Sequence, residues 1–141
     1  MVFDFNILAF LIAVIGSIVL GSLWYGPFFG EQWAKEMGFD MDEMKKNMDP
    51  KKKQEMMRSY MGMMISLIIQ VLAFILLLSN LPINDLVDGV IWGVVLAVGV
   101  VWTETIGGVL WENHSWQLFS INALYRLLVS LFMTVIIVLF F

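Results

Sequence analysis

The sequence predicts an all-α membrane protein, a bundle of four helices that cross a bilayer. Of its 141 residues, 60% are hydrophobic, and the mean hydropathy is +0.86. Only 14% are charged, which is too few to form the polar shell of a soluble domain of this size. Four separate stretches each reach the ~20 apolar residues that a spanning helix needs. The length suits one compact domain.

The four predicted spans are residues 5–25, 60–81, 86–111 and 116–141. The first contains no charged residue, whereas the third contains Glu104 and the fourth contains Arg126. Asp49 and Pro50 have the pattern of an N-cap followed by proline at the first helical position. From Pro50 the helical pattern continues without a breaker into the second span. We therefore expect one helix of about 30 residues, longer than the bilayer core is thick.

The basic residues predict the orientation. Seven of the eight lie between the first and second spans, and short loops rich in Lys and Arg stay in the cytoplasm. Residues 26–59 are therefore expected to form a cytoplasmic segment, with both chain ends outside. The seven are Lys35, Lys45, Lys46, Lys51, Lys52, Lys53 and Arg58.

The predicted cytoplasmic segment has helical features of its own. Gly38 is suited to end a short helix that begins near Gly30. Asp40 and Glu43 have the spacing of a capping box, which predicts a second short helix.

Three methionines in this segment, Met41, Met44 and Met48, recur at helical spacing. Thioether sulfurs at this spacing suit Cu(I). The pattern is more typical of the apolar face of a helix lying on a membrane or on a partner, and we predict that role rather than a metal site.

Several function classes lack their characteristic residues. Cysteine is absent, so thiolate metal sites and cysteine nucleophiles are excluded. His114 is the sole histidine and has only Glu112 nearby, an incomplete metal or catalytic set. The net charge is −4 and no basic patch with interleaved aromatics is present, which argues against nucleic acid. We predict no cofactor, and membrane lipids and further copies of the chain as partners.

Small residues recur at helical spacing in every span, as expected where helices pack in lipid. Glu104 and Arg126 lie on these stripes and almost equally far from the turn near residue 115. We therefore predict an intramembrane polar site at a common depth, with an ion pair between Glu104 and Arg126, alongside Ser17 and Gln70. Either the pair fixes helix register or the site handles a substrate or proton. The stripes are Ala9, Ala13, Ser17 and Gly21; Gly62, Ser66, Gln70 and Ala73; Gly93, Ala97, Glu104, Gly107 and Gly108; and Asn122, Ala123, Arg126, Ser130 and Thr134.

Two runs of the sequence resemble the motifs of a known family. They are Leu-Trp-Tyr-Gly-Pro-Phe-Phe-Gly-Glu-Gln-Trp-Ala-Lys-Glu-Met-Gly, residues 23–38, and Leu-Trp-Glu-Asn-His-Ser-Trp-Gln-Leu-Phe-Ser-Ile-Asn-Ala-Leu-Tyr, residues 110–125. The chain resembles domain of unknown function 1761, a family of small, mostly bacterial membrane proteins. The resemblance implies a bacterial cytoplasmic (inner) membrane and no particular activity. The matching positions are Trp24, Tyr25, Pro27, Gly30, Trp33, Gly38, Glu112, Asn122 and Tyr125.

Both motifs are expected at the cytoplasmic interface, one closing the first span and the other turning between the third and fourth. Their shared role is either helix capping and loop docking or a pocket for a lipid headgroup or small ligand. The candidate rim residues are Trp24, Tyr25, Pro27, Gly30, Trp33, Glu112, Asn122 and Tyr125.

These observations favour a non-enzymatic, homo-oligomeric helical bundle that acts as a scaffold or binds a lipid or small ligand at its cytoplasmic side. One alternative is a small proton-coupled transporter or channel in which Glu104 titrates. Another is a membrane enzyme with Glu112, Asn122 and Tyr125 at its rim.

Overall fold

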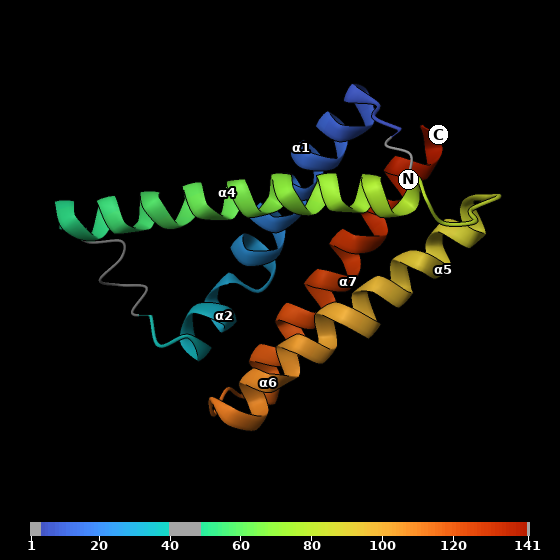
Figure 1. The fold of residues 1–141 in the computed structure, drawn as a ribbon. Helices are drawn as coiled ribbons and strands as arrows, with labels where there is room; N and C mark the ends of the chain where they lie inside the picture. Colours follow the sequence, from blue (N-terminus) through green and yellow to red (C-terminus); the bar gives the residue numbers. More distant parts are fainter. Residues whose placement is uncertain (1–3, 40–48, 141) are drawn as a thin grey trace.

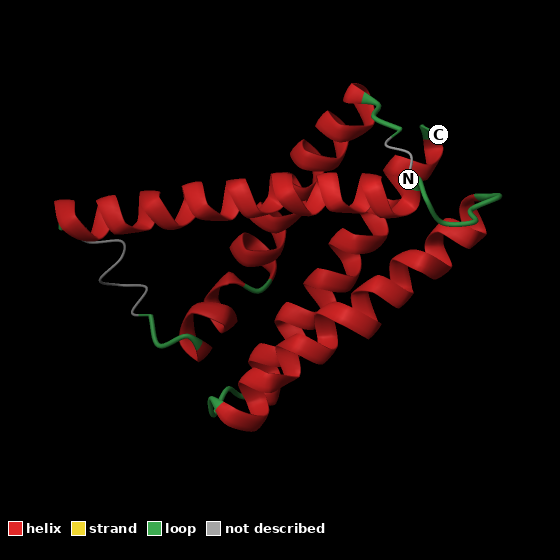
Figure 2. Cartoon of the chain, viewed as in Figure 1, coloured by secondary structure: helices red, strands yellow, loops and turns green. Residues whose placement is uncertain are grey.

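The computed structural model describes residues 4–39 and 49–140, and this part of the chain is helical with short connections and no strands (Figure 2). Four helices are long and apolar enough to cross a membrane, as predicted. Two of them contain π-helical segments, labelled η. The elements are α1 (Ile7–Leu23), η1 (Trp24–Phe28), α2 (Gly30–Glu36), α4 (Pro50–Leu78), α5 (Leu86–Leu96), η2 (Ala97–Trp102), α6 (Thr103–Trp111) and α7 (Trp116–Leu139) (Figure 1).

The long helices begin at polar caps, because their first N–H groups have no partner within the helix. Asn6 accepts from the N–H groups of Leu8 and Ala9 at the start of α1. Asp49 accepts from Lys51 at the start of α4, so the prediction of one long helix beginning at Pro50 is confirmed. Asp85 caps α5, and Ser115 caps α7.

Helix α7 is the centre of the bundle and packs against α1 on one side and α5 on another (Figure 1). Glycines permit this close approach, as lipid-embedded helices require. A Cβ added to Gly93 would lie 2.9 Å from Thr134 Oγ1, and one added to Gly16 would meet the Phe132 ring. The predicted small-residue stripe of the first span is likewise buried, at Ala9, Ala13 and Ser17.

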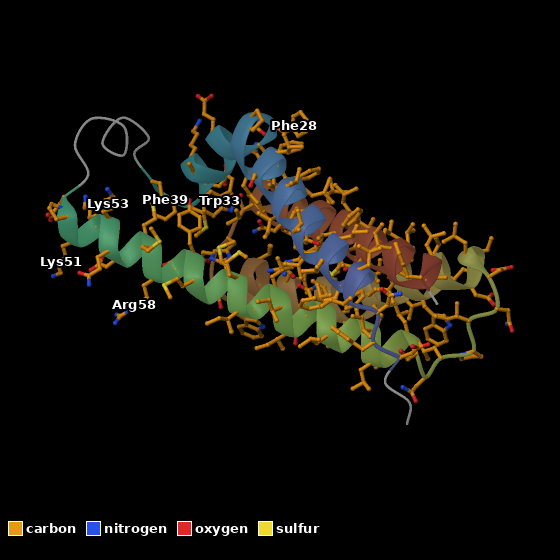
Figure 3. All side chains as sticks on the ribbon, turned by 90° about the horizontal axis from the view of Figure 1, so that it is seen from above. Phe28, Trp33, Phe39, Lys51, Lys53 and Arg58 are labelled. Carbon is orange, nitrogen blue, oxygen red and sulfur yellow. The ribbon has the colours of Figure 1, made fainter. Side chains whose placement is uncertain are left out.

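Helix α4 packs on the bundle only through its C-terminal third. Its buried residues are Val71, Phe74, Ile75 and Leu78. Toward its start the helix diverges from α1 and α7 (Figures 1 and 3). The start of α1, the end of α7 and the α4–α5 connection lie toward one end of the bundle, and α2 and the α6–α7 turn lie toward the other.

The predicted packing stripe of α4 was wrong. Gly62, Ser66 and Ala73 are exposed in the single chain, and Gln70 is half-buried. The larger apolar side chains on the neighbouring face of the helix fill the core instead, since they remove more surface from the solvent than small residues do.

The third span contains one extra residue in its helical turn. Gly89, Gly93 and Ala97 are buried at α-helical spacing, and the π-helical segment η2 follows. The single hydroxyl hydrogen of Thr103 is shared between the carbonyl oxygens of Gly99 and Val100, at Oγ1–O distances of 2.9 and 2.8 Å. Side chains beyond η2 are rotated relative to an unbroken α-helix.

The short helix α2 ends close to the predicted position, and Gly38 follows it with a φ of +76°, a conformation that favours glycine. The predicted capping box of Asp40 and Glu43 lies outside the described residues. So do Met41, Met44 and Met48, and their surface role stays a prediction.

The glycine contacts predict a difference between two identical substitutions. Gly93→Val should destabilise the bundle by about 1–3 kcal/mol, because its side chain overlaps Thr134 and Leu131. Gly62→Val carries the same intrinsic helix cost, but a Cβ there meets nothing within 4 Å. Thermal unfolding in detergent compares the two. Equal losses of stability would contradict the packing of α5 on α7.

Candidate functional site at the aromatic end of the bundle

The first motif breaks the helix of the first span. Gly26 has non-helical angles, φ −103° and ψ −106°, and Pro27 follows it without an N–H to donate. The N–H of Phe29 bonds the carbonyl oxygen of Trp24 at 2.9 Å and closes the wide turn. Gly30 is buried where an added Cβ would lie 2.5 Å from the Tyr25 carbonyl oxygen. The chain is therefore kinked between α1 and α2.

The break brings the aromatic side chains of the motif against α7. The Tyr25 hydroxyl donates to Asn122 Oδ1 at 2.9 Å. The Tyr25 ring meets Tyr125 and Trp33 edge-on, with centroids 4.9 and 5.6 Å apart. Trp24 packs on Tyr125 with centroids 6.3 Å apart. We call Trp24, Tyr25, Trp33, Asn122 and Tyr125 the aromatic cluster.

Two tryptophans from different spans donate hydrogen bonds to the backbone of α7. Trp24 Nε1 donates to the carbonyl oxygen of Ile121 at 3.1 Å. Trp102, at the end of η2, donates through Nε1 to the carbonyl oxygen of Ala123 at 2.7 Å. The two acceptors are two residues apart and so lie on opposite sides of the helix. The first and third spans are therefore fixed to the same level of α7.

Five of the eight candidate rim residues thus form the aromatic cluster, and Pro27 and Gly30 shape the backbone that delivers it. Glu112 does not join them. It is exposed on the α6–α7 turn, with a carboxylate oxygen 3.6 Å from His114 Nε2. A site that combines Glu112 with Asn122 and Tyr125 is not assembled in the chain.

Sequence reasoning missed two further contacts at this end. Trp102 was not selected, because nothing in the sequence indicates that a mid-span indole meets a backbone carbonyl. The hydroxyl of Ser115 also donates to a carboxylate oxygen of Glu36 and joins α2 to the start of α7. The preference of Ser115 for the N-cap position was the one available clue to its location.

The predicted ion pair between Glu104 and Arg126 is not formed in the structure, which describes both residues. Both side chains are exposed on the single chain. Ser17 is buried and its hydroxyl donates to the Ala13 carbonyl oxygen at 2.7 Å, while Gln70 is half-buried. The predicted ion pair is therefore wrong for the single chain, and the common depth of the four residues stays a prediction.

The extra residue in η2 explains the error. In an unbroken α-helix, positions 93, 97 and 104 share a face, since eleven residues make about three turns. Beyond η2 the face toward α7 instead includes Trp102, whose indole reaches Ala123. Glu104 follows two positions later, about 200° round the helix, and points away from α7.

Arg126 lies on α7 beside the aromatic cluster. It is near Tyr25 and Tyr125. Two polar groups of the cluster are hydrogen-bonded: the Tyr25 hydroxyl donates to Asn122 Oδ1, and the Trp24 indole N–H donates to the carbonyl oxygen of Ile121. The arrangement joins α1, α2 and α7, and the cluster contains no acid–base pair.

Four helices that are long and apolar enough to cross a membrane are compatible with a small four-span helical membrane protein. The chain belongs to the family described as protein of unknown function (DUF1761), whose model matches residues 8–138. No curated protein and no solved structure matches the chain.

The hydrogen bond between Tyr25 and Asn122 can be measured with a double-mutant cycle of Tyr25→Phe and Asn122→Leu. We expect each single change to destabilise the protein and the pair to show a coupling of about 0.5–1.5 kcal/mol. Tyr60→Phe is the matched control, because Tyr60 is exposed on α4. Purely additive effects in thermal unfolding would mean that the bond contributes nothing.

Proposed function

We propose that this protein is a non-enzymatic bundle of the bacterial cytoplasmic membrane that assembles with copies of itself and binds anionic phospholipid headgroups at its cytoplasmic side. Its two termini lie outside, and residues 26–59 lie in the cytoplasm. The observation that carries the lipid-binding proposal is the charged start of α4, which projects from the bundle on the side where α2 lies.

The length of α4 supports this placement. Its 29 residues extend for about 44 Å, whereas the hydrocarbon core is about 30 Å thick. The helix has no fully buried residue before Val71, and Leu67 is partly buried against the core. When its apolar part from about Tyr60 to Leu78 crosses the bilayer, its first turns reach the headgroups and the cytoplasm.

These first turns carry an excess of positive charge. Residues 49–58 contain four basic side chains and two acidic ones, Asp49 and Glu55, so the net charge is +2. Lys51 and Arg58 point outward from the start of α4, and Lys53 lies on the side nearer to α2 (Figure 3). Basic residues next to a spanning helix attract anionic lipid with about 1 kcal/mol each.

Aromatic side chains supply the second element of a headgroup-level surface. Trp33 and Phe39 lie on the side of α2 that faces α4, and Phe28 points to the other side (Figure 3). Phe28 is 66% exposed and Phe39 is 46% exposed. Exposed aromatic rings at this level are typical of the membrane interface. Together, the rings and the basic turns suit the boundary between acyl chains and phosphate groups.

The transport alternative requires an aqueous path to Glu104 and stays a prediction. The enzyme alternative loses its proposed site, because Glu112 lies apart from Asn122 and Tyr125, paired with His114. The scaffold and lipid-binding hypothesis therefore has the most support.

Lipid preference can be measured by tryptophan quenching in vesicles that contain brominated acyl chains on either an anionic or a zwitterionic phospholipid. Stronger quenching by the brominated anionic lipid is expected for the native chain. Replacing Lys51, Lys53 and Arg58 with Gln should lower that preference about tenfold or more, since each charge contributes about 1 kcal/mol.

The matched control replaces Glu31, an exposed acid on α2, with Gln. High salt should also weaken the preference of the native chain, because the charges lie at the surface. Equal quenching by the two lipids, or an unchanged preference in the triple variant, would contradict the lipid-binding proposal.

A further inference from the structure

Two opposite charges remain unpaired in the spanning part of the chain. Glu104 lies on α6 and Arg126 on α7; both are exposed, and neither forms an ion pair with a described residue. The acyl chains of lipid satisfy neither charge, and a charged side chain in the hydrocarbon region costs at least ~2.5 kcal/mol. Each therefore requires a partner other than the described residues of its own chain.

We propose that Glu104 of one copy pairs with Arg126 of the next copy in a closed, head-to-tail assembly. This inference rests on the self-assembly in the proposed function and names the contact that produces it. The occupant of each site is a second copy of the chain, because that copy presents the opposite charge in the same membrane orientation. The contact joins two different surfaces, so it is head-to-tail rather than two-fold, and it closes into a ring when the rotation between successive copies allows it.

The surface around Glu104 permits close helix approach. Gly99 and Gly107 lie before and after it, and a Cβ added to either meets nothing within 4 Å. By contrast, a Cβ on Gly93 would press on Thr134, and one on Gly108 would press on His114. Packing within the chain therefore explains the glycines at 93 and 108 but not those at 99 and 107. A partner helix that approaches Glu104 closely would account for the open pair.

Arg126 lies on the face of α7 that α4 covers only in part. Val129, Met133 and Ile137 follow it at three- and four-residue spacing and pack in the same core cluster as the C-terminal third of α4. One turn toward the aromatic end, α4 has diverged and Arg126 is exposed (Figure 1). A neighbouring copy can approach along this uncovered part of α7.

In a ring of parallel copies, the two charged side chains come to similar levels along the helix axes. The bond from Trp102 to Ala123 sets these two residues opposite each other. Glu104 is then about 3 Å nearer the α6–α7 turn and Arg126 about 4.5 Å farther from it, a difference of ~7.5 Å. Side chains tilt toward the N-terminus of their own helix, so Arg126 leans toward the turn and Glu104 leans away from it. The two side chains thus converge.

Crosslinking tests the contact directly, because the native chain contains no cysteine. Glu104→Cys and Arg126→Cys are made in separate chains that carry different tags and are co-expressed, and the membranes are treated with a mild oxidant. We expect disulfide-linked dimers that contain one chain of each kind. Neither variant expressed alone should form dimers. Dimers of Glu104→Cys with itself, or no mixed dimers at all, would overturn the proposal.

Charge reversal gives an independent measurement. Its double variant is also a control for folding, because restored association requires folded chains. Glu104→Arg and Arg126→Glu should each weaken self-association, measured by energy transfer between labelled copies in vesicles, by about tenfold or more, and the double reversal should restore it. Glu31→Lys is the control for a charge reversal outside the contact. If all variants associate equally, this pairing is wrong while the proposed assembly stands; if the native chain is monomeric, both fail.

Discussion

Two indole N–H groups that donate to carbonyl oxygens of α7 fix the positions of its neighbours. Trp24 bonds Ile121 from the first span, and Trp102 bonds Ala123 from the third. Each carbonyl oxygen has a second lone pair available beside its helical bond, so α7 remains intact. A net contribution of about 1 kcal/mol per bond is modest, but the bonds select one register among many that apolar packing alone leaves close in energy. The levels of Glu104 and Arg126 relative to each other follow from that register.

The bundle is unevenly packed as a consequence. On two sides of α7, glycines and other small residues bring α1 and α5 close, and the aromatic cluster closes one end. On a third side, α4 contributes only Val71, Phe74, Ile75 and Leu78 and leaves its long apolar middle uncovered. Much of that surface, including Met61, Met63 and Ile65, is suited to lipid or to a second copy. The charged start of α4 is free to reach the headgroup region.

Much of this structure follows from residue pattern. Hydropathy predicted the four spans, Asp49 with Pro50 predicted the start of α4, and Gly38 the end of α2. The meeting of Tyr25 with Asn122 followed from two motifs placed at one end of the bundle. The prediction of an ion pair between Glu104 and Arg126 was wrong because the sequence does not reveal the extra residue in η2. The hydrogen bonds of η2 are made by backbone groups, which are common to all residues. The predicted burial of the small residues of α4 was wrong because small residues permit close packing of helices without requiring it.

The central claim is that η2 rotates the third span so that Glu104 points away from α7. A spin-label scan of positions 98–110 tests it, with collision rates measured against oxygen, which concentrates in lipid, for the dispersed single chain in nanodiscs. The account predicts low rates at 102, 105 and 109 and high rates at 100, 103 and 104, one residue out of phase with positions 89, 93 and 97. An unbroken α-helical period, with 104 as protected as 93 and 97, would contradict it.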